Sequence, residues 1–190
     1  MKQENRFDEI KHEYWRGNIR LLSVNQILEL AGYDYKFTNQ SAMDKGKSAH
    51  KTIELAIRGL LDKGALDPIL ADYLSAFEMV SQDLGLDIIE TEQQIYSKKY
   101  PIAGTFDILA IVNNKLTIID LKTGQPNLKR ERLQTAGYMS IYNEDRASID
   151  CVEQRMIIYL KNATYSILTE NEKDVDIFKA CIKIAFYKIN

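Results

Sequence analysis

Ala103-Gly-Thr-Phe-Asp-Ile-Leu-Ala-Ile-Val-Asn-Asn-Lys-Leu-Thr-Ile-Ile-Asp-Leu-Lys-Thr-Gly124 contains two apolar runs that are joined at Asn113-Asn114. Runs of this length and composition predict two β-strands. Asparagine tolerates a positive φ angle, so a two-residue hairpin turn fits between the strands. The stretch therefore predicts an antiparallel hairpin that carries Asp107, Asp120 and Lys122 towards its open end.

The register of this hairpin follows by counting outward from the turn. The predicted pairs are Val112 with Lys115, Ile111 with Leu116, Leu109 with Ile118, and Asp107 with Asp120. Opposed residues place their Cβ atoms roughly 5 Å apart, and like charges at that distance destabilise a sheet. A divalent metal ion held by Asp107 and Asp120, with Lys122 beside it, is the simplest way to balance the two carboxylates. The alternative is a solvated strand exit followed by a turn at Thr123-Gly124.

Composition indicates an ordinary globular protein. The 190 residues fit one domain, with 45% hydrophobic and 27% charged residues. A net charge of −2 argues against a purely electrostatic DNA binder, though not against a local basic groove. Cys151 and Cys181 lie too far apart in sequence to suggest an iron–sulfur or zinc site, and a disulfide is not expected.

The chain begins with a polar segment and has no run of 18 apolar residues, so we expect a soluble protein in the cytoplasm of a bacterial or phage-infected cell, with no membrane partner. We predict a single domain over residues 1–190, with a helical N-terminal part, 1–86, and a sheet core, 87–190. For residues 1–20 no element is predicted. There, Tyr14-Trp15-Arg16 either stacks on bases or forms an aromatic patch pinned on the domain.

The N-terminal part shows three helix signals. Ser23-Val-Asn-Gln26 is a capping box, which predicts a helix ending near Gly32. Helical spacing of apolar residues, including Leu60 and Leu61, predicts a second helix over 42–63. Asp67-Pro68 opens a third, which continues to Gly85. In the second helix, His50 and Glu54 lie on one face, either as a surface pair or with His50 as a metal ligand.

The remaining elements surround the hairpin. A strand is predicted over 88–96, from which Glu90 or Glu92 could join the Asp107 face. A helix over 129–142 places Gln134 and Tyr138 on one side. Lys129, Arg130 and Arg132 crowd its start, either as a solvated turn or as a basic patch where DNA phosphates would pass. Strands over 154–160 and 163–168 and a helix over 172–187 complete the domain.

Taken together, these motifs resemble the PD-(D/E)XK nuclease superfamily, and more narrowly its RecB-like branch of phage exonucleases, CRISPR-associated nucleases and the mitochondrial genome maintenance exonuclease. The resemblance covers residues 23–142, about two-thirds of the chain. The matching motifs, in chain order, are Ser23-Val-Asn-Gln-Ile-Leu28, Gly46-Lys-Ser-Ala-His50 leading to Glu54, Glu92, Gly104-Thr-Phe-Asp107, Ile118-Ile-Asp120-Leu-Lys122-Thr-Gly124, and Gln134-Thr-Ala-Gly-Tyr138.

The resemblance implies an α/β fold with a restriction-endonuclease-like core, a mixed β-sheet flanked by helices. It also implies that Asp107 and Asp120 are the acidic metal ligands and that Lys122 steadies the attacking water or the scissile phosphate. Mg²⁺ or Mn²⁺ would be the cofactor, because hard cations prefer oxygen ligands and can activate water for phosphodiester hydrolysis.

Further roles are implied position by position. His50 resembles an additional metal ligand, Glu92 a supporting acid, and Gln134 with Tyr138 a helix motif thought to hold the active site and the DNA backbone. No proline precedes Asp107, which is ordinary variation. The four cysteines of the cluster-bearing members are absent, so that subgroup is excluded.

The leading hypothesis is a metal-dependent deoxyribonuclease, and the resemblance favours an exonuclease acting on DNA ends or single strands. The alternatives are a structure- or sequence-directed endonuclease, a non-cleaving DNA-binding protein on the same fold, and a binding module with an unrelated sheet. DNA is the expected partner. No helicase or recombinase motif occurs, so a recombinase, helicase or single-strand-binding partner would be another chain.

Overall fold

A computed structural model describes residues 4–34, 40–168 and 170–189. Its strands are β1 (Asn5–Asp8), β2 (Glu13–Arg16), β3 (Ile19–Ser23), β4 (Asp87–Tyr96), β5 (Ile102–Val112), β6 (Lys115–Lys122), β7 (Gln154–Lys161) and β8 (Thr164–Leu168). Its helices are α1 (Val24–Leu30), α2 (Gln40–Ile57), α3 (Pro68–Leu84), α4 (Leu128–Tyr142) and α5 (Asp174–Ile189), with short 3-10 turns at Lys63–Ala65 and Ser148–Asp150.

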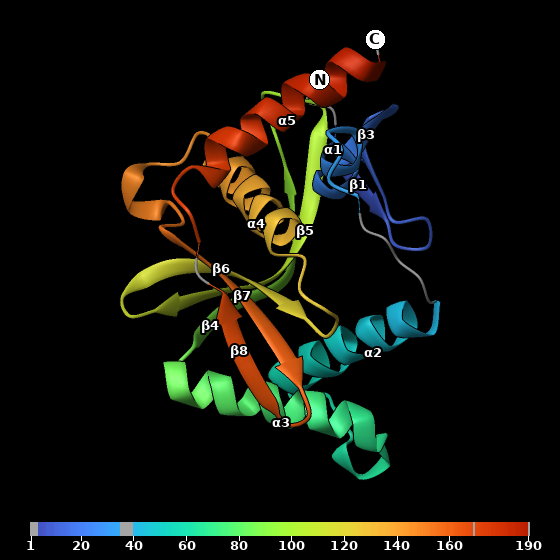
Figure 1. The fold of residues 1–190 in the computed structure, drawn as a ribbon, viewed down its shortest axis with the longest axis vertical. Helices are drawn as coiled ribbons and strands as arrows, with labels where there is room; N and C mark the ends of the chain where they lie inside the picture. Colours follow the sequence, from blue (N-terminus) through green and yellow to red (C-terminus); the bar gives the residue numbers. More distant parts are fainter. Residues whose placement is uncertain (1–3, 35–39, 169, 190) are drawn as a thin grey trace.

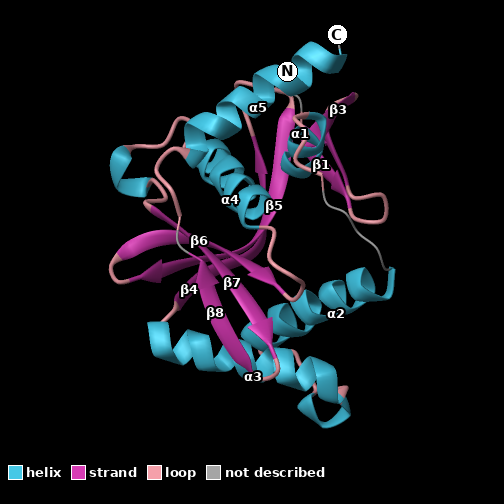
Figure 2. Ribbon diagram, viewed as in Figure 1, coloured by secondary structure: helices cyan, strands magenta, loops and turns pink. Residues whose placement is uncertain are grey.

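The strands form one mixed sheet in the order β1-β2-β3-β5-β6-β7-β8, and β4 pairs with β5. The β3–β5 and β6–β7 pairs are parallel and the others are antiparallel. Helices α1, α4 and α5 pack on one side, and α2 and α3 lie on the other (Figures 1 and 2). The predicted α/β class, a mixed sheet flanked by helices, is confirmed.

Two apolar cores hold the helices to the sheet. Phe106, Leu109 and Ile118 pack with α1, α4 and α5, whereas Ile108 and Leu121 pack with α2 and α3. Adjacent residues on a strand point to opposite faces, which explains why Leu109 and Ile108 belong to different cores. Phe106 and Ile108 are two residues apart and should share a face, yet they belong to different cores. The strand therefore departs from regular alternation at Asp107.

The sequence predicts a helical N-terminal part over residues 1–86. The structure differs there, because the strands β1, β2 and β3 precede α1. Tyr14 on β2 is buried, its ring stacks on Phe7 with centroids 4.7 Å apart, and its hydroxyl lies 2.9 Å from that of Thr105. Tyr14 is therefore pinned on the domain and does not offer a stacking face. Short strands rich in polar residues carry little periodic signal, which explains the missing prediction.

The helix ends follow local chemistry. Ser23 forms the predicted capping box with Gln26, and α3 begins after Asp67 and ends at Gly85 in a left-handed conformation, as predicted. Helix α2 ends at Ile57, earlier than predicted, and Leu60 is exposed rather than part of a core stripe. Gly59 has a φ of +69°, which turns the chain out of the helix.

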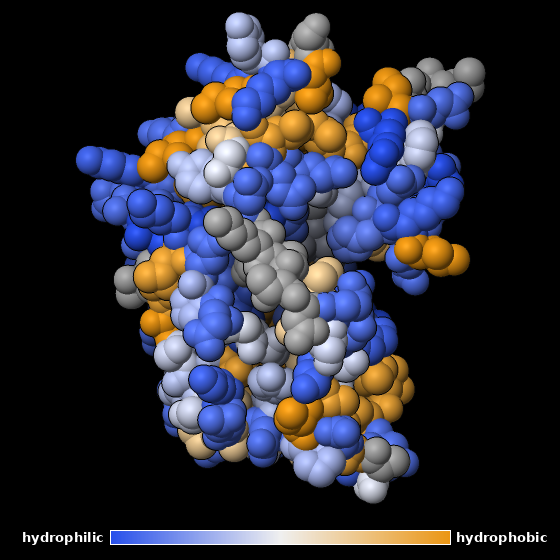
Figure 3. Space-filling model, turned by 45° about the vertical axis from the view of Figure 1, so that its right-hand side comes forward, coloured by the Kyte–Doolittle hydropathy of each residue, from blue (hydrophilic) through white to orange (hydrophobic). Residues whose placement is uncertain are grey.

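The described part of the chain contains no helix that is both long and apolar enough to cross a membrane. Hydrophilic side chains predominate on the face drawn in Figure 3, and apolar ones lie there in separate groups.

Candidate active site

The central hairpin has the predicted turn and register. Asn113 and Asn114 have φ angles of +50° and +61°, as a two-residue turn of this kind requires. The ladder pairs Val112 with Lys115 and continues to Ile108 with Ile119. Beyond that pair the ladder stops, so the predicted direct pairing of Asp107 with Asp120 is absent from it.

Asp107 replaces the missing ladder bond with its side chain. Its Oδ2 accepts a hydrogen bond of 2.6 Å from the backbone N–H of Leu121 on β6. Nearer its start, β5 pairs instead with β3, through Ile102 and Ala103. The β5–β6 ladder thus ends just before Asp107 and Asp120, and we call this place the split in the sheet.

Three side chains from three elements meet at the split. His50 of α2, Glu92 of β4 and Asp107 of β5 each offer a ligand atom, and these atoms lie within 4.8 Å of one another. His50 Nδ1 lies 3.2 Å from Asp107 Oδ1. One imidazole nitrogen and two carboxylates form a donor set that suits Mn²⁺ or Mg²⁺.

Of the two glutamates on β4, Glu92 joins the cluster and Glu90 does not. Thr91 pairs with Ile108 and Gln93 with Phe106, which sets Glu92 opposite Asp107. Glu92 has a φ of +53°, an uncommon conformation for a residue inside a strand. Such strain gathers at functional sites. The sequence gives no sign of it, because the irregularity is in the backbone.

Glu54 lies next to the cluster but has other partners. It is buried, and its two carboxylate oxygens pair with Lys51 at 2.8 Å and Arg58 at 2.9 Å. His50 therefore pairs with Asp107 and not with Glu54, so the surface-pair alternative is wrong. Glu54 lines a narrow pocket together with His50 and Glu92.

Asp120 and Lys122 form a second, buried group beside the cluster. Lys122 Nζ lies 2.5 Å from Asp120 Oδ2, and the Asp120 side chain is only 3% exposed. Among the described residues, Oδ2 makes no hydrogen bond of ordinary geometry. Asp120 is not one of the three residues in the cluster. Its role as a metal ligand therefore stays a prediction.

A buried carboxylate that the sequence did not suggest lies behind Lys122. Glu131 of α4 accepts hydrogen bonds from the Tyr159 hydroxyl and from the backbone N–H of Asn127, the latter at 3.0 Å. Tyr159 is the partner of Lys122 in the parallel β6–β7 ladder. The charge of Glu131 helps to keep Lys122 protonated. A glutamate in the first turn of a helix is too common to be a signal.

Gln134 and Tyr138 lie together on the buried side of α4, as their spacing predicts. The Gln134 side-chain amide donates a hydrogen bond of 2.9 Å to the Tyr138 hydroxyl. Both side chains are buried, and burial together with the charge of Asp120 raises the pKa of Tyr138 well above its usual value. The Tyr138 ring packs on β5 at Gly104, where an added Cβ would lie 2.8 Å from a ring carbon.

This close approach predicts that Gly104→Ala destabilises the protein by about 1–3 kcal/mol, because a methyl group there overpacks the Tyr138 ring. Urea denaturation measures the free energy of unfolding. Gly124→Ala is the matched control, since a Cβ at Gly124 would meet nothing within 4 Å. Equal stability of both variants would contradict the prediction.

Two of the three basic residues predicted to face DNA are engaged inside the protein. Arg130 is buried, and its guanidinium donates to Asn25 and Glu29 of α1. Arg132 makes two hydrogen bonds, of 3.0 and 2.9 Å, to Asp174. Only Lys129 of the three is exposed. A cluster of basic residues in the sequence does not show which side of the helix faces the core. The DNA-contact prediction is therefore not kept for Arg130 and Arg132.

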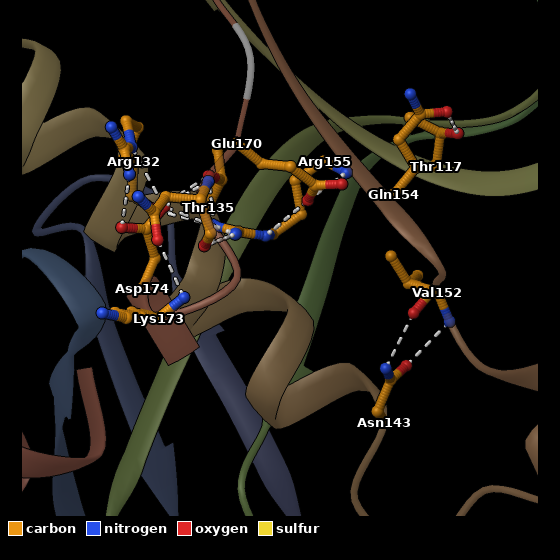
Figure 4. A network of polar contacts seen from close by, with 11 residues as sticks. Thr117, Arg132, Thr135, Asn143, Val152, Gln154, Arg155, Glu170, Lys173 and Asp174 are labelled. Atoms are coloured by element: carbon orange, nitrogen blue, oxygen red, sulfur yellow. Dashed lines mark hydrogen bonds and ion pairs between the residues drawn. The ribbon is translucent and has the colours of Figure 1, made fainter. Parts of the chain in front are cut away.

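Figure 4 shows where Arg132 belongs. Asp174 also receives a contact of 3.5 Å from buried Arg155 of β7, whose guanidinium further donates to Glu170 and to the backbone carbonyl of Arg132. The network ties β7, α4 and the start of α5 together. It holds α4, and therefore Gln134 and Tyr138, against the sheet.

The charges of the cluster are strongly coupled. Burial alone would lower the pKa of His50, but the charge and hydrogen bond of Asp107 raise it to about 9. Burial and the nearby charge of Asp107 raise the pKa of Glu92 to about 7. Burial favours the neutral form of Asp107, yet His50 and Lys122 outweigh it and lower the pKa of this carboxyl. The cluster thus retains protons near neutral pH that a bound cation would displace.

Affinity for Mn²⁺ should therefore increase as the pH is raised from about 6 to about 9, because Glu92 and His50 must lose protons to bind a cation. Isothermal titration calorimetry with Mn²⁺ at pH 6, 7 and 8 measures this affinity. Glu92→Gln should bind more weakly and lose about a tenfold share of the change between pH 6 and 8, and it should keep the larger share that comes from deprotonation of His50. Glu90→Gln, an exposed neighbour on the same strand, should behave as wild type. Equal wild-type affinity at pH 6 and pH 8 would refute the assignment.

No protein-family model matches the chain, and curated proteins give no significant match. Among solved structures, the chain is similar to a phage-related exonuclease from Haemophilus somnus 129PT, with 14% identity over 90% of this chain and 96% of that chain and a TM-score of 0.44. It is similar to the alkaline exonuclease LHK-Exo from Laribacter hongkongensis, with 9% identity over 89% and 87% and a TM-score of 0.43. It is also similar to the structure of SSO0001, with 18% identity over 89% of this chain and 76% of that chain and a TM-score of 0.39. Likenesses this distant do not assign the chain to a family.

Proposed function

We propose that this protein is a divalent-metal-dependent nuclease that hydrolyses DNA phosphodiester bonds. The observation that carries the proposal is the meeting of His50, Glu92 and Asp107 at the split in the sheet, directly beside the buried Asp120–Lys122 pair. A structural cluster would not need three acids, a histidine and a lysine from four separate segments. A protein that only binds DNA gains nothing from carboxylates, which repel phosphates.

The donor set fits Mg²⁺ or Mn²⁺, and His50, Glu92 and Asp107 would hold the ion. When bound, the ion would lower the pKa of a water molecule and neutralise charge on the phosphoryl oxygens. Asp120 is a further oxygen ligand in this proposal on the strength of the motif resemblance, and its Oδ2 forms the ion pair with Lys122 at 2.5 Å. The nitrogen of His50 favours Mn²⁺ somewhat over Mg²⁺.

The chain's own groups perform the remaining tasks. Lys122 is a compact positive charge that Asp120 holds in place and that would stabilise phosphoryl charge or position water. Asp107 orients His50 through their 3.2 Å contact and fixes the β6 backbone through Leu121. Gln134 and Tyr138 support the site from α4, and Lys129 is the exposed cation on that helix.

Within this function we propose exonuclease action on DNA ends or single strands, on the strength of the motif resemblance alone. One assay tests both the nuclease and the exonuclease proposals. The protein is incubated with end-labelled linear single-stranded, linear duplex or closed circular DNA in the presence of Mn²⁺, Mg²⁺ or EDTA. We expect metal-dependent shortening of linear DNA and no attack on circles. Cutting of circles would indicate an endonuclease. Folded protein that cleaves nothing in any metal would refute the nuclease.

A further inference from the structure

A second pocket lies away from the cluster, where β2 and β3 meet the connection between β4 and β5. It has a volume of about 230 Å³. Its wall consists of three basic residues, one tyrosine and three other apolar residues, and it includes no carboxylate among the described residues. The lining residues are Arg16, Ile19, Leu21, Lys98, Lys99, Tyr100 and Pro101.

The loop that carries Lys98 and Lys99 is held by hydrogen bonds to buried side chains. Ser97 is fully buried, its Oγ accepts hydrogen bonds from the backbone N–H groups of Lys99 and Tyr100, and it donates to Glu144 at 2.8 Å. Glu144 also accepts from the backbone N–H of Lys98 at 2.7 Å. Ser97 and Glu144 therefore fix the backbone of this loop, so a ligand that binds its side chains pays little conformational entropy to order it.

The basic groups of the pocket remain available for an anion. No carboxylate in the described part of the chain pairs with the Lys99 ammonium. Lys98 pairs with Asp145 at 3.3 Å, but both side chains are at least half exposed, so this pair is weak. Arg16 uses its guanidinium to bind the carbonyl of Ser97 and the side chain of Asn5, which leaves further N–H donors.

We infer that this pocket binds one nucleotide of a single DNA strand, outside the catalytic cluster. Lys98, Lys99 and Arg16 would contact phosphate, and the ring of Tyr100, 40% exposed, would pack with Ile19 against the base or sugar. Cationic groups interleaved with an aromatic ring are the usual means of holding single strands without sequence preference. This inference rests on the proposed function, which supplies DNA as the substrate.

The position of the pocket sets a length requirement. It lies at the start of β5, next to Ile102, and Asp107 follows five residues later. At about 3.3 Å per residue the separation along the strand is roughly 16 Å. The phosphates of one strand advance about 3.4 Å each along the axis of a helix, so a strand in helical conformation needs about five nucleotides to reach from the cluster to the pocket, and an extended strand needs fewer.

Fluorescence anisotropy in EDTA measures binding without cleavage. The probes are labelled oligothymidylates of 4 and 20 nucleotides. For Lys98→Ala/Lys99→Ala we expect about tenfold weaker binding of the 20-mer and a salt dependence reduced by about 1.4 in log–log slope, the value for two lost contacts to a single strand. Tyr100→Ala should weaken 20-mer binding about tenfold without changing the slope. Binding of the 4-mer should weaken in both variants as well, because the pocket holds a single nucleotide and EDTA leaves no metal at the cluster to anchor the strand.

The matched control is Lys63→Ala/Lys179→Ala, which removes two exposed lysines that lie outside the pocket. The inference is overturned if this control weakens 20-mer binding as much as the pocket variant does. It is also overturned if inorganic phosphate competes as well as the 20-mer, which indicates a general anion site, or if the wild type does not bind DNA without metal. Cleavage assays decide the nuclease separately: an active enzyme with no Lys98/Lys99 effect refutes the pocket alone.

Discussion

Asp107→Asn should reduce metal-dependent DNA cleavage on the order of 1,000-fold or more. Asparagine keeps the shape of the side chain and can still accept the hydrogen bond from Leu121, so the fold should survive. What is lost is the negative charge that completes the cluster and holds His50 in its orientation. Loss of a metal ligand removes several kcal/mol of charge stabilisation from the reaction, which corresponds to this decrease in rate.

The measurement is the initial rate of cleavage of end-labelled DNA in Mn²⁺ and in Mg²⁺. A second readout is independent of activity: Mn²⁺ should raise the melting temperature of the wild type, because it binds the folded state, and should not raise that of Asp107→Asn. Asp176→Asn is the matched control, since this carboxylate is 82% exposed on α5. A variant at Asp107 that retained a tenth of the wild-type rate would contradict the proposed site.

The sequence predicted the part of the site that depends on local rules. A turn of two asparagines sets the hairpin register, and counting from it brings Asp107, Asp120 and Lys122 to the open end of the hairpin, where the structure has them. Helical spacing likewise places Gln134 beside Tyr138. These predictions succeed because periodicity and turn geometry act over a few residues.

Features that depend on tertiary packing could not be predicted. The parting of β5 from β6 at Asp107 and the positive φ of Glu92 are set by the whole sheet, and they decide that Glu92 joins the cluster while Glu90 does not. Arg130 and Arg132 look like a surface patch in sequence, yet Glu29 and Asp174, distant along the chain, draw them inward. Long-range ion pairs leave no periodic trace.

The largest effect on stability is expected from Lys122→Met. The ammonium of Lys122 is the closest cation to the buried Asp120 carboxylate, and methionine fills similar space without charge. Removing one partner of a buried pair leaves an uncompensated charge, and the cost is about 3 kcal/mol or more. DNA cleavage should fall roughly 100- to 1,000-fold as well, since a positioned cation is lost.

The pH dependence of this loss distinguishes the mechanism. Even with Lys122 present, burial raises the pKa of Asp120 to about 6, above its unfolded value of 3.8. A raised carboxyl pKa contributes stability that is complete below the unfolded pKa and is lost as the pH rises through the folded pKa. Without the ammonium this pKa should rise further. The destabilisation by Lys122→Met should thus be small at pH 5 and large at pH 8, as measured by urea denaturation.

Asp120→Asn/Lys122→Met provides the matched comparison. This double variant removes both charges, so its stability at pH 8 should recover most of what the single variant loses, whereas its cleavage activity should stay low. Stability and activity would then separate, which a purely structural ion pair would not produce. If Lys122→Met lost as much stability at pH 5 as at pH 8, the cost would come from packing or from the nearby charges of Asp107 and Glu131, and Asp120 would not be the charge that Lys122 balances.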